Sequence, residues 1–267
     1  MTTLETPVTT DSRLAAIVDD VVEALCGVIR THRVTVEEYR TATDWLTRAG
    51  QQEFQIPLLL DLFLSTTVDE MGASADGGTE SNVEGPFYLP DMPMLEPPYV
   101  LPRREDEPGE VLLFSGSVTS TDGIPLPGAL VDVWQDNGAG EYSYFHPGVP
   151  ENNLRGRLLT DADGRFELET ILPVPYEVPT DGAVGVLLAA LGRSAFRPAH
   201  VHVKVSHETT RPLTTQIYFA GDPWLEDDVV VGAVKPELVT TVVWSSDDSE
   251  SFTRATCSYD FVLPAAA

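Results

Sequence analysis

Residues 197–205 read Arg197-Pro198-Ala199-His200-Val201-His202-Val203-Lys204-Val205, so two histidines stand two positions apart in a run of valines. In a β-strand, the side chains at i and i+2 point to the same face. Both imidazoles would therefore project together from a rigid element, which is how a pair of metal ligands is held. The chain has only five histidines in 267 residues, and this spacing makes His200 and His202 candidate ligands.

Short β-rich runs broken by turns fill the chain from residue 110 onward. Many short strands at regular spacing are typical of an antiparallel β-sandwich, which is the fold we expect here. One helical insert is expected at 185–191. The runs that predict strands are 111–118, 129–134, 157–160, 165–168, 200–205, 213–220, 239–245 and 256–263.

The first third of the chain is expected to be helical. Apolar residues recur at helical spacing over 12–27, 34–49 and 55–71. Thr35 followed by Glu38 is typical of a capping box at the start of the second helix. These helices form a layer too thin to be a comfortable independent domain, so we expect it to pack on the rest of the chain or on a second copy of itself.

A long connector, 72–108, is rich in glycine, proline and acidic residues. Connectors of this length without obvious structure are uncommon in compact domains unless they are functional. The connector contains Glu84-Gly85-Pro86-Phe87-Tyr88, an apolar and aromatic group in a polar run. This group is either a loop fastened to a sheet by its aromatic residues or part of a pocket wall.

The composition argues against several classes of partner. Lysine and arginine number 16 against 42 aspartates and glutamates, which gives a net charge of −26. Such a charge disfavours nucleic acid and anionic membranes as partners. Cys26 and Cys257 lack a metal-type spacing and are expected to be free thiols in a reducing cytoplasm. We see no signal peptide and no apolar run of about 18 residues, so a cytoplasmic location is expected.

Two tyrosines upstream of the histidines, Tyr142 and Tyr176, suggest which metal is bound. Phenolate is a hard anionic ligand that suits Fe(III), whereas imidazole suits several first-row metals. Two imidazoles, two phenolates and one hydroxide around Fe(III) sum to zero charge, and a neutral site is cheaper to bury than a charged one. A chelating dianion that replaced the hydroxide and one phenolate would keep that sum, which fits a catecholate.

Each of these features taken alone is more often structural. Tyr142 and Tyr144 lie in a run that usually indicates surface tyrosines on a strand, and Tyr176 follows Pro175 as packed aromatic residues often do. The histidine pair alone binds a metal in a minority of cases. Only their joint occurrence, in this order, favours a metal site.

With these stretches together, the chain resembles the intradiol ring-cleaving dioxygenases of the catechol 1,2-dioxygenase group. The resemblance extends over residues 12–262. The stretches that carry it are Glu84-Gly85-Pro86-Phe87-Tyr88, Val131-Asp132-Val133-Trp134, Thr170-Ile171-Leu172-Pro173, Gly192-Arg193, Arg197-Pro198-Ala199-His200-Val201-His202 and Thr214-Thr215-Gln216.

This resemblance implies an α+β, mainly β, protein with two parts. Residues 1–105 would form a helical dimerisation region and linker, and 106–267 a β-sandwich catalytic domain. The protein would be a non-haem Fe(III) homodimer, with a lipid held at the helical interface in several relatives. It would use O₂ to cleave catechol or a substituted catechol between its hydroxyl-bearing carbons, giving cis,cis-muconate in the catabolism of aromatic compounds.

The resemblance also implies roles for individual residues. Tyr142 would be the phenolate ligand that stays bound, and Tyr176 the one that leaves when substrate arrives, with His200 and His202 as the imidazole ligands. Arg197 would stabilise negative charge on the substrate, and Gln216 would lie near the substrate. The pocket-wall positions are Val83, Pro86, Phe87, Val229 and Val230.

Several alternatives stay open from the sequence. The family commonly has histidine after the tryptophan at 134, where this chain has Gln135, and Tyr144 is a rival to Tyr142 as ligand. The substrate could be hydroxyquinol or a chlorocatechol, and the aliphatic pair at 229–230 favours a pocket that accepts an alkyl or halogen substituent. A more distant alternative is a metal-free β-sandwich binding module that uses surface aromatics such as Trp224 and Trp244.

Overall fold

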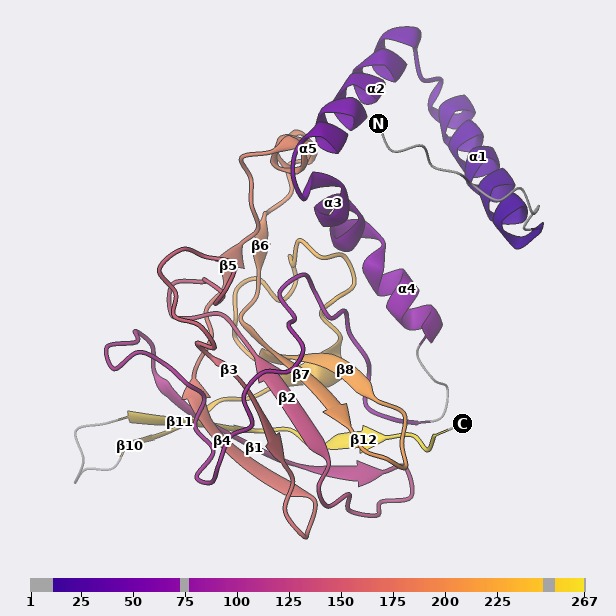
Figure 1. The fold of residues 1–267 in the computed structure, drawn as a ribbon. Helices are drawn as coiled ribbons and strands as arrows, with labels where there is room; N and C mark the ends of the chain where they lie inside the picture. The colour runs from indigo at the N-terminus through magenta and orange to yellow at the C-terminus, as the bar shows by residue number, and fades with distance from the viewer. Residues whose placement is uncertain (1–11, 73–76, 247–252, 267) are drawn as a thin grey trace, which may run out of the picture. The chain divides into compact units, whose positions relative to one another are not determined.

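The computed structural model describes residues 12–72, 77–246 and 253–266 (Figure 1). The chain divides into two compact units, Met1–Glu53 and Phe54–Ala267. Helices dominate the start of the chain and strands the remainder. The predicted α+β class, mainly β with a helical N-terminal region, is confirmed.

The first unit contains helices α1 (Ser12–His32) and α2 (Val36–Gln51). Helix α1 is five residues longer than the 12–27 segment predicted, because the apolar spacing continues through Val28 and Ile29. The capping box that starts α2 is confirmed. Thr35 Oγ1 accepts from the Glu38 amide at 3.2 Å, and the Glu38 carboxylate accepts from the Thr35 amide at 2.7 Å.

One helix was expected over 55–71, but the structure has two: α3 (Gln55–Phe63) and α4 (Ser65–Gly72). The break falls at Leu64, whose φ of −128° is not helical. Beside it, Ser65 Oγ donates to the Asp61 carbonyl at 2.6 Å, a side-chain bond of the kind that bends helices. The predicted insert is confirmed as α5 (Ala183–Leu191).

The first sheet is built around the long strand β1. Its partners are parallel on one side and antiparallel on the other, because β11 and β12 pair with β1 in parallel and β4 pairs with it antiparallel. The sheet is therefore mixed. Its strands are β10 (Val243–Ser246), β11 (Thr253–Ser258), β1 (Val111–Ser120), β12 (Phe261–Leu263) and β4 (Arg165–Ile171).

The second sheet has the order β3-β2-β7-β8-β9, antiparallel except for the β8–β9 pair. A separate two-stranded sheet joins β5 to β6. The strands are β3 (Arg155–Leu159), β2 (Leu130–Trp134), β7 (His200–Ser206), β8 (Leu213–Phe219), β9 (Val239–Thr240), β5 (Tyr176–Glu177) and β6 (Phe196–Arg197), and the short 3₁₀ helix η1 covers Pro236–Leu238.

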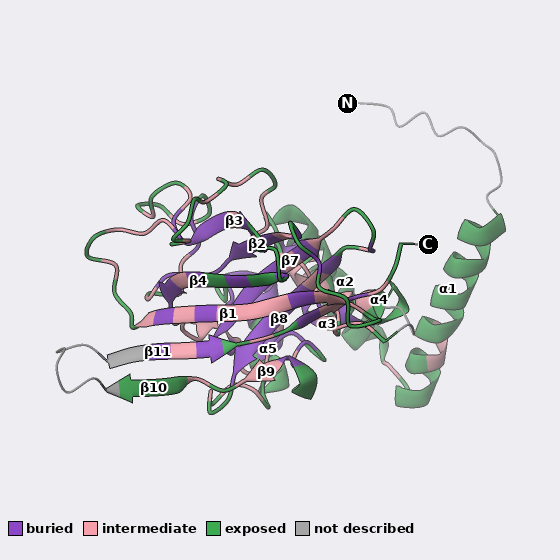
Figure 2. Ribbon diagram, turned by 90° about the horizontal axis from the view of Figure 1, so that it is seen from below, coloured by how far each residue is buried: buried purple, intermediate pink, exposed green. Residues whose placement is uncertain are grey.

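The two large sheets share one apolar core. Buried residues of β1, β4, β11 and β12 pack with buried residues of β2, β3, β7 and β8, which makes the predicted sandwich. In Figure 2 the strands carry most of the buried residues, whereas α1 is almost entirely exposed. On β7, Val201, Val203 and Val205 belong to this core. His200 and His202 therefore face the other side of the sheet together.

The connector crosses the sandwich without forming a long strand in its described part, 77–108. Leu101 is buried and its amide donates to Glu169 at 2.9 Å. Near its start, Glu84 forms an ion pair of 2.6 Å with Lys204, and Lys204 Nζ lies 4.4 Å from the centre of the Tyr88 ring. The connector is thus fastened to β7, the strand that carries the two histidines.

No helix among the described residues is long and apolar enough to cross a membrane.

Asp132 of β2 lies beneath this connector and is 5% exposed. Tyr88 Oη donates to its carboxylate at 3.4 Å. Burial raises the pKa of Asp132 from 3.8 to about 6, although Arg157 and Lys204 act in the opposite direction. The folded protein therefore binds this proton more tightly than the unfolded chain does, and stability falls as the pH rises through this window.

We expect Asp132→Asn to remove this pH dependence. Below pH 3.8 the buried carboxyl is protonated and does not lower the free energy of unfolding. Above about pH 6 it is ionised and lowers that free energy in full, by roughly 3 kcal/mol for a shift of about two pKa units. Urea denaturation from pH 4 to 7 should show the variant gaining stability over the wild type as the pH rises. The exposed Asp163→Asn is the control, and a gap that stays constant with pH would contradict the assignment.

Candidate metal centre

The pairing of β7 with β8 positions the centre of the site. His202 lies opposite Gln216 and His200 opposite Tyr218. As predicted, the two histidines point the same way, and their Nε2 atoms converge to 3.0 Å. Both residues are 1% exposed. Two nitrogens this close can be neighbouring ligands of one ion at bond lengths of about 2.1 Å.

The backbone decides which nitrogen of His200 is available to an ion. Its Nδ1 lies 2.8 Å from the carbonyl oxygen of Pro198. Because a carbonyl only accepts, Nδ1 carries the proton and Nε2 keeps its lone pair. Burial lowers the pKa of both imidazoles well below its usual range, and Arg197 adds to this at His200. Both rings are therefore neutral, the form that binds metals.

The ring of His202 is held by β2 and by the connector. Trp134 stacks on it with the two planes 9° apart and the centres separated by 4.7 Å. Gly85 approaches its edge, and a Cβ added at this glycine would lie 3.3 Å from His202 Cε1. Gly85 also has a φ of +72°, so both the space and the backbone favour glycine here.

The structure brings both predicted tyrosines to the histidine pair. Tyr142 lies in the turn that follows β2, and Tyr176 begins β5. Their rings meet edge to face with centres 5.7 Å apart. The Tyr142 ring centre lies 6.3 Å from that of His202, and the Tyr176 ring centre lies 5.7 Å from that of His200.

The two tyrosines differ in their surroundings. Tyr142 is fully buried, and its phenol oxygen forms no hydrogen bond of sound geometry. Tyr176 is partly exposed on a strand of two residues. Burial raises the pKa of both phenols, with the neighbouring Tyr176 adding to the effect at Tyr142 and Arg197 opposing it at Tyr176. A bound cation would satisfy the orphaned oxygen of Tyr142 and favour its ionised form.

These donors fit Fe(III). No group of three or more His, Cys, Asp or Glu side chains in the described part of the chain could hold a metal ion. Two phenolates with two imidazoles form a hard, electron-rich set of the kind that suits this ion.

Tyr144, the rival ligand, is placed elsewhere. It is 47% exposed, and its hydroxyl donates to Asn152 Oδ1 at 2.7 Å. Its φ of +69° turns the backbone at this point. Of the two tyrosines in this turn, Tyr142 is the one at the histidine pair.

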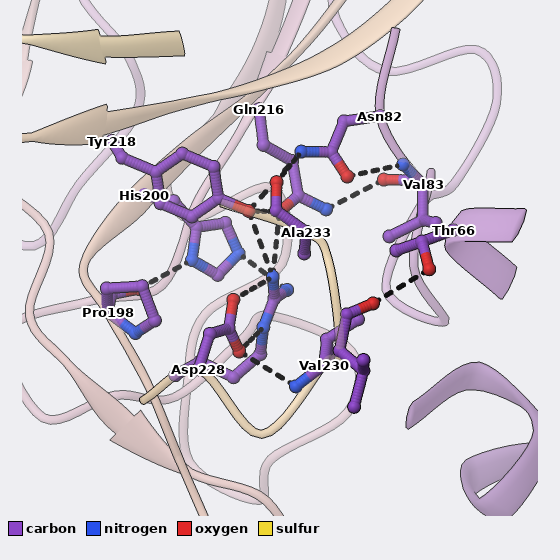
Figure 3. Close-up of polar contacts among 12 residues, drawn as sticks. Thr66, Asn82, Val83, Pro198, His200, Gln216, Tyr218, Asp228, Val230 and Ala233 are labelled. Carbon is purple, nitrogen blue, oxygen red and sulfur yellow. Dashed lines mark hydrogen bonds and ion pairs between the residues drawn. The ribbon is translucent and has the colours of Figure 1, made fainter. Parts of the chain in front are cut away.

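Arg197 and Gln216 lie together beside His200, and Figure 3 shows Gln216, His200 and Asp228 in this cluster. Arg197 Nη2 donates to Gln216 Oε1 at 2.9 Å, and Arg197 Nη1 lies 3.2 Å from His200 Nε2. Gln216 Nε2 donates to the Val83 carbonyl at 2.7 Å, which ties the connector to β8. The structure thus gathers both predicted residues at the site.

The predicted wall residues fall into two groups. Phe87 stacks on the Tyr142 ring with centres 4.3 Å apart, and Pro86 is exposed in the turn beside it. Val229 and Val230 are buried in a small apolar cluster against which Val83 packs. The connector therefore contributes to both groups, and residues 229–230 join it from late in the sequence.

Four buried polar residues near the centre were not predicted from the sequence. Asp228 forms an ion pair with Arg197, and Tyr218 bonds to the same guanidinium. Asp136 is buried without a hydrogen bond of sound geometry, and burial raises its pKa well above the usual range. Arg155 is fully buried on β3. In so acidic a chain, the sequence does not distinguish Asp228 from a surface aspartate such as its neighbour Asp227, which is exposed.

Comparisons with known proteins agree along nearly the whole chain. The family profile described as "Catechol dioxygenase N terminus" matches residues 11–80, and that described as "Dioxygenase" matches residues 83–265. A chlorocatechol 1,2-dioxygenase of Rhodococcus opacus is 39% identical over 256 residues, covering 95% of this chain and 98% of that protein. Catechol 1,2-dioxygenase 2 of Acinetobacter lwoffii is 40% identical, covering 86% of this chain and 85% of that protein.

A solved structure shows the same fold. The crystal structure of 3-chlorocatechol 1,2-dioxygenase from Rhodococcus opacus matches with a TM-score of 0.89 and 39% identity, covering 96% of this chain and all of that one. The matches extend across both the helical region and the sandwich. From them we conclude that this chain belongs to the intradiol ring-cleaving dioxygenases, a family characterised by non-haem iron.

Proposed function

We propose that this protein cleaves catechol or a chlorocatechol with O₂ between the two hydroxyl-bearing carbons, giving a cis,cis-muconate, at a non-haem Fe(III) ion. The ligands would be Tyr142, Tyr176, His200 and His202. The observation that carries the proposal is the approach of the two Nε2 atoms to 3.0 Å, with both phenol rings beside them. When bound, Fe(III) supplies a Lewis acid that holds the catecholate and makes its ring reactive toward O₂.

The contrast between the two tyrosines supports different roles for them. Tyr142 is fully buried and stacked against Phe87, so its ring has little freedom to move. Tyr176 is partly exposed on the short β5–β6 pair, and Arg197 stands opposite it in register. Tyr176 is thus the phenol suited to leaving the metal ion when substrate binds, and its Oη can then hold a proton taken from a substrate hydroxyl.

Arg197 provides positive charge at the same point. Its Nη1 lies beside His200 Nε2, so it can stabilise negative charge that develops on a substrate there. Gln216 accepts from Arg197 and donates to Val83, and it therefore holds the arginine and the connector in place. Phe87 and the valine pair exclude water from the reacting groups.

The wall favours a substituent that needs no hydrogen bond. Val229 and Val230 pack with Val184 and Leu188 in an apolar cluster. A chlorine atom can lie against such a surface, whereas a third hydroxyl group would be buried without a partner. The apolar wall therefore supports catechol or a chlorocatechol over hydroxyquinol as the substrate, whereas relatives of similar identity are named for all three compounds.

We expect Tyr142→Phe to change the visible spectrum of the iron-loaded protein. A tyrosinate on Fe(III) gives a broad charge-transfer band, and loss of the buried phenolate should weaken and shift that band. The matched control is Tyr144→Phe, which removes an exposed hydroxyl two residues away and should leave the band unchanged. The ligand assignment is wrong if the two variants exchange these results.

Turnover of three substrates tests the reaction and its preference. We expect the iron-loaded protein to give kcat/KM values for catechol and 4-chlorocatechol that exceed the value for hydroxyquinol by about tenfold or more, because a buried hydroxyl lacks a partner. Proton NMR of the products distinguishes a muconate from its isomer, the semialdehyde formed by cleavage outside the hydroxyl-bearing carbons, because only the semialdehyde has an aldehyde hydrogen. A semialdehyde product would overturn the proposed function.

We also propose a homodimer formed through the helical region. No residue of α1 is buried, yet Ile17, Val21, Leu25 and Val28 form an exposed apolar stripe at helical spacing. A second copy would cover this stripe, and a lipid at the interface would share it. The domain boundary at residue 105 and the cytoplasmic location stay predictions, with Cys26 and Cys257 both free thiols.

Sedimentation velocity should give the wild type twice the chain mass of 29.1 kDa. Val21→Glu combined with Leu25→Glu should give a monomer, because two carboxylates would be buried in the apolar interface. Arg30→Glu adds a carboxylate on the opposite side of the helix and should leave the dimer intact. A monomeric wild type would contradict the proposal, and lipid extraction from the purified dimer tests for the bound lipid.

A further inference from the structure

The guanidinium of Arg197 is held by a carboxylate that neither the sequence nor the proposed mechanism assigns to the site. Arg197 Nε donates to Asp228 Oδ1 at 3.2 Å, and Nη2 donates to Asp228 Oδ2 at 3.1 Å. The side chains are 5% and 4% exposed. A two-point contact between a planar guanidinium and a carboxylate fixes the orientation of the fork as well as its charge.

The remaining acceptors engage the same edge of the guanidinium. Nη2 also faces Gln216 Oε1 at 2.9 Å and Tyr218 Oη at 3.2 Å, and Tyr218 Oη donates to Gln216 Oε1 at 2.7 Å. Four acceptor oxygens from three residues thus surround Nε and Nη2. Nη1 points instead at His200 Nε2, 3.2 Å away, on the side of the four candidate ligands.

We propose that Asp228 is a positioning residue for Arg197. Its carboxylate holds the guanidinium so that the Nη1 edge faces the substrate. This proposal rests on the proposed function, because it takes the reacting ring to lie beside His200. Gln216 and Tyr218 cannot replace the carboxylate, since both are neutral and each meets only Nη2.

The same carboxylate also fixes the wall. Asp228 Oδ1 accepts from the Val230 amide at 2.9 Å, and the Val229 amide donates to the Phe196 carbonyl next to Arg197. Asp228 Oδ1 therefore serves both the guanidinium and the Val230 amide, and a dashed line in Figure 3 marks the bond to Val230. Asp228 thus fixes both the position of the Arg197 guanidinium, which would face the substrate ring, and the start of the apolar wall formed by Val229 and Val230.

The adjacent acidic pair provides a matched comparison. Asp228→Asn keeps the shape of the side chain but removes the charge, and Asp227→Asn makes the same change at an exposed neighbour. Each protein is loaded with iron, its iron content and visible spectrum are recorded, and kcat and KM are measured with the catechol that the wild type turns over fastest.

We expect Asp228→Asn to retain iron and the charge-transfer band while kcat falls about 10- to 100-fold. The guanidinium stabilises charge that develops only during the reaction, and in this variant it no longer points at that charge. KM should change less than about threefold, and Asp227→Asn should stay within about twofold of the wild type in both constants. An unchanged kcat in Asp228→Asn would overturn the proposal.

A double-mutant cycle shows whether Asp228 acts through Arg197. In an Arg197→Ala background, Asp228→Asn should lower kcat no further, because there is no guanidinium left to orient. Two losses that multiply independently would overturn the positioning role. If Asp228→Asn does not fold, Asp228→Glu replaces it, since it keeps the ion pair but displaces the guanidinium. That variant should lower kcat while its Tm stays near the wild-type value, and an unchanged kcat would again overturn the role.

The same cycle on melting temperatures of the metal-free proteins needs no substrate. Each single replacement should lower Tm, and the double replacement should lower it by less than the sum of the two, because the pair is coupled. Additive changes would overturn the coupling. If the wild type cleaves no catechol, only the proposed function is contradicted, because the melting temperatures still test the coupling of Asp228 to Arg197.

Discussion

Hydrogen bonding of β7 on both of its edges, to β2 and to β8, is the constraint on which the rest of the structure depends. A strand fixed in this way must send alternate side chains into the sandwich, and Val201, Val203 and Val205 meet that demand. A slip of one residue would put His200 and His202 into the apolar core and expel the valines. One register therefore specifies both the core and the face that carries the histidine pair.

Burial of so many polar groups at one point requires balanced charge. Arg197 is neutralised by Asp228, and the two histidines are neutral. Arg155 is stabilised by oxygen atoms instead, because its guanidinium donates to Ser143 Oγ at 2.7 Å, to the Ser143 carbonyl at 3.2 Å and to the Phe87 carbonyl at 2.6 Å. That arginine also joins the turn that carries Tyr142 to the connector that carries Phe87.

Much of this arrangement could be predicted from the sequence, and the rest could not for identifiable reasons. Alternation along β7 and the capping box at Thr35 are local patterns, and local patterns are visible in a sequence. The choice between Tyr142 and Tyr144 depends on which face of a turn is buried. The break at Leu64 interrupts an unbroken apolar pattern, and the structure places a side-chain bond of Ser65 beside it.

Asp228 was hidden for a different reason. Its importance comes from a partner 31 residues away, and in a chain with 42 acidic residues a single buried carboxylate has no signature. Resemblance to a family identified Arg197 but not the group that holds it. Pairwise contacts between distant charged residues are the part of a site that sequence patterns describe least well.

The order in which the centre's parts occur along the chain has a consequence for biosynthesis. All four candidate ligands, and the connector that passes Gly85 against His202, precede the end of β7. The valine pair of the wall, Val229 and Val230, and the counter-ion of Arg197, Asp228, come later. During synthesis, all four candidate ligands therefore leave the ribosome before the valine pair, and Arg197 emerges 31 residues ahead of its counter-ion.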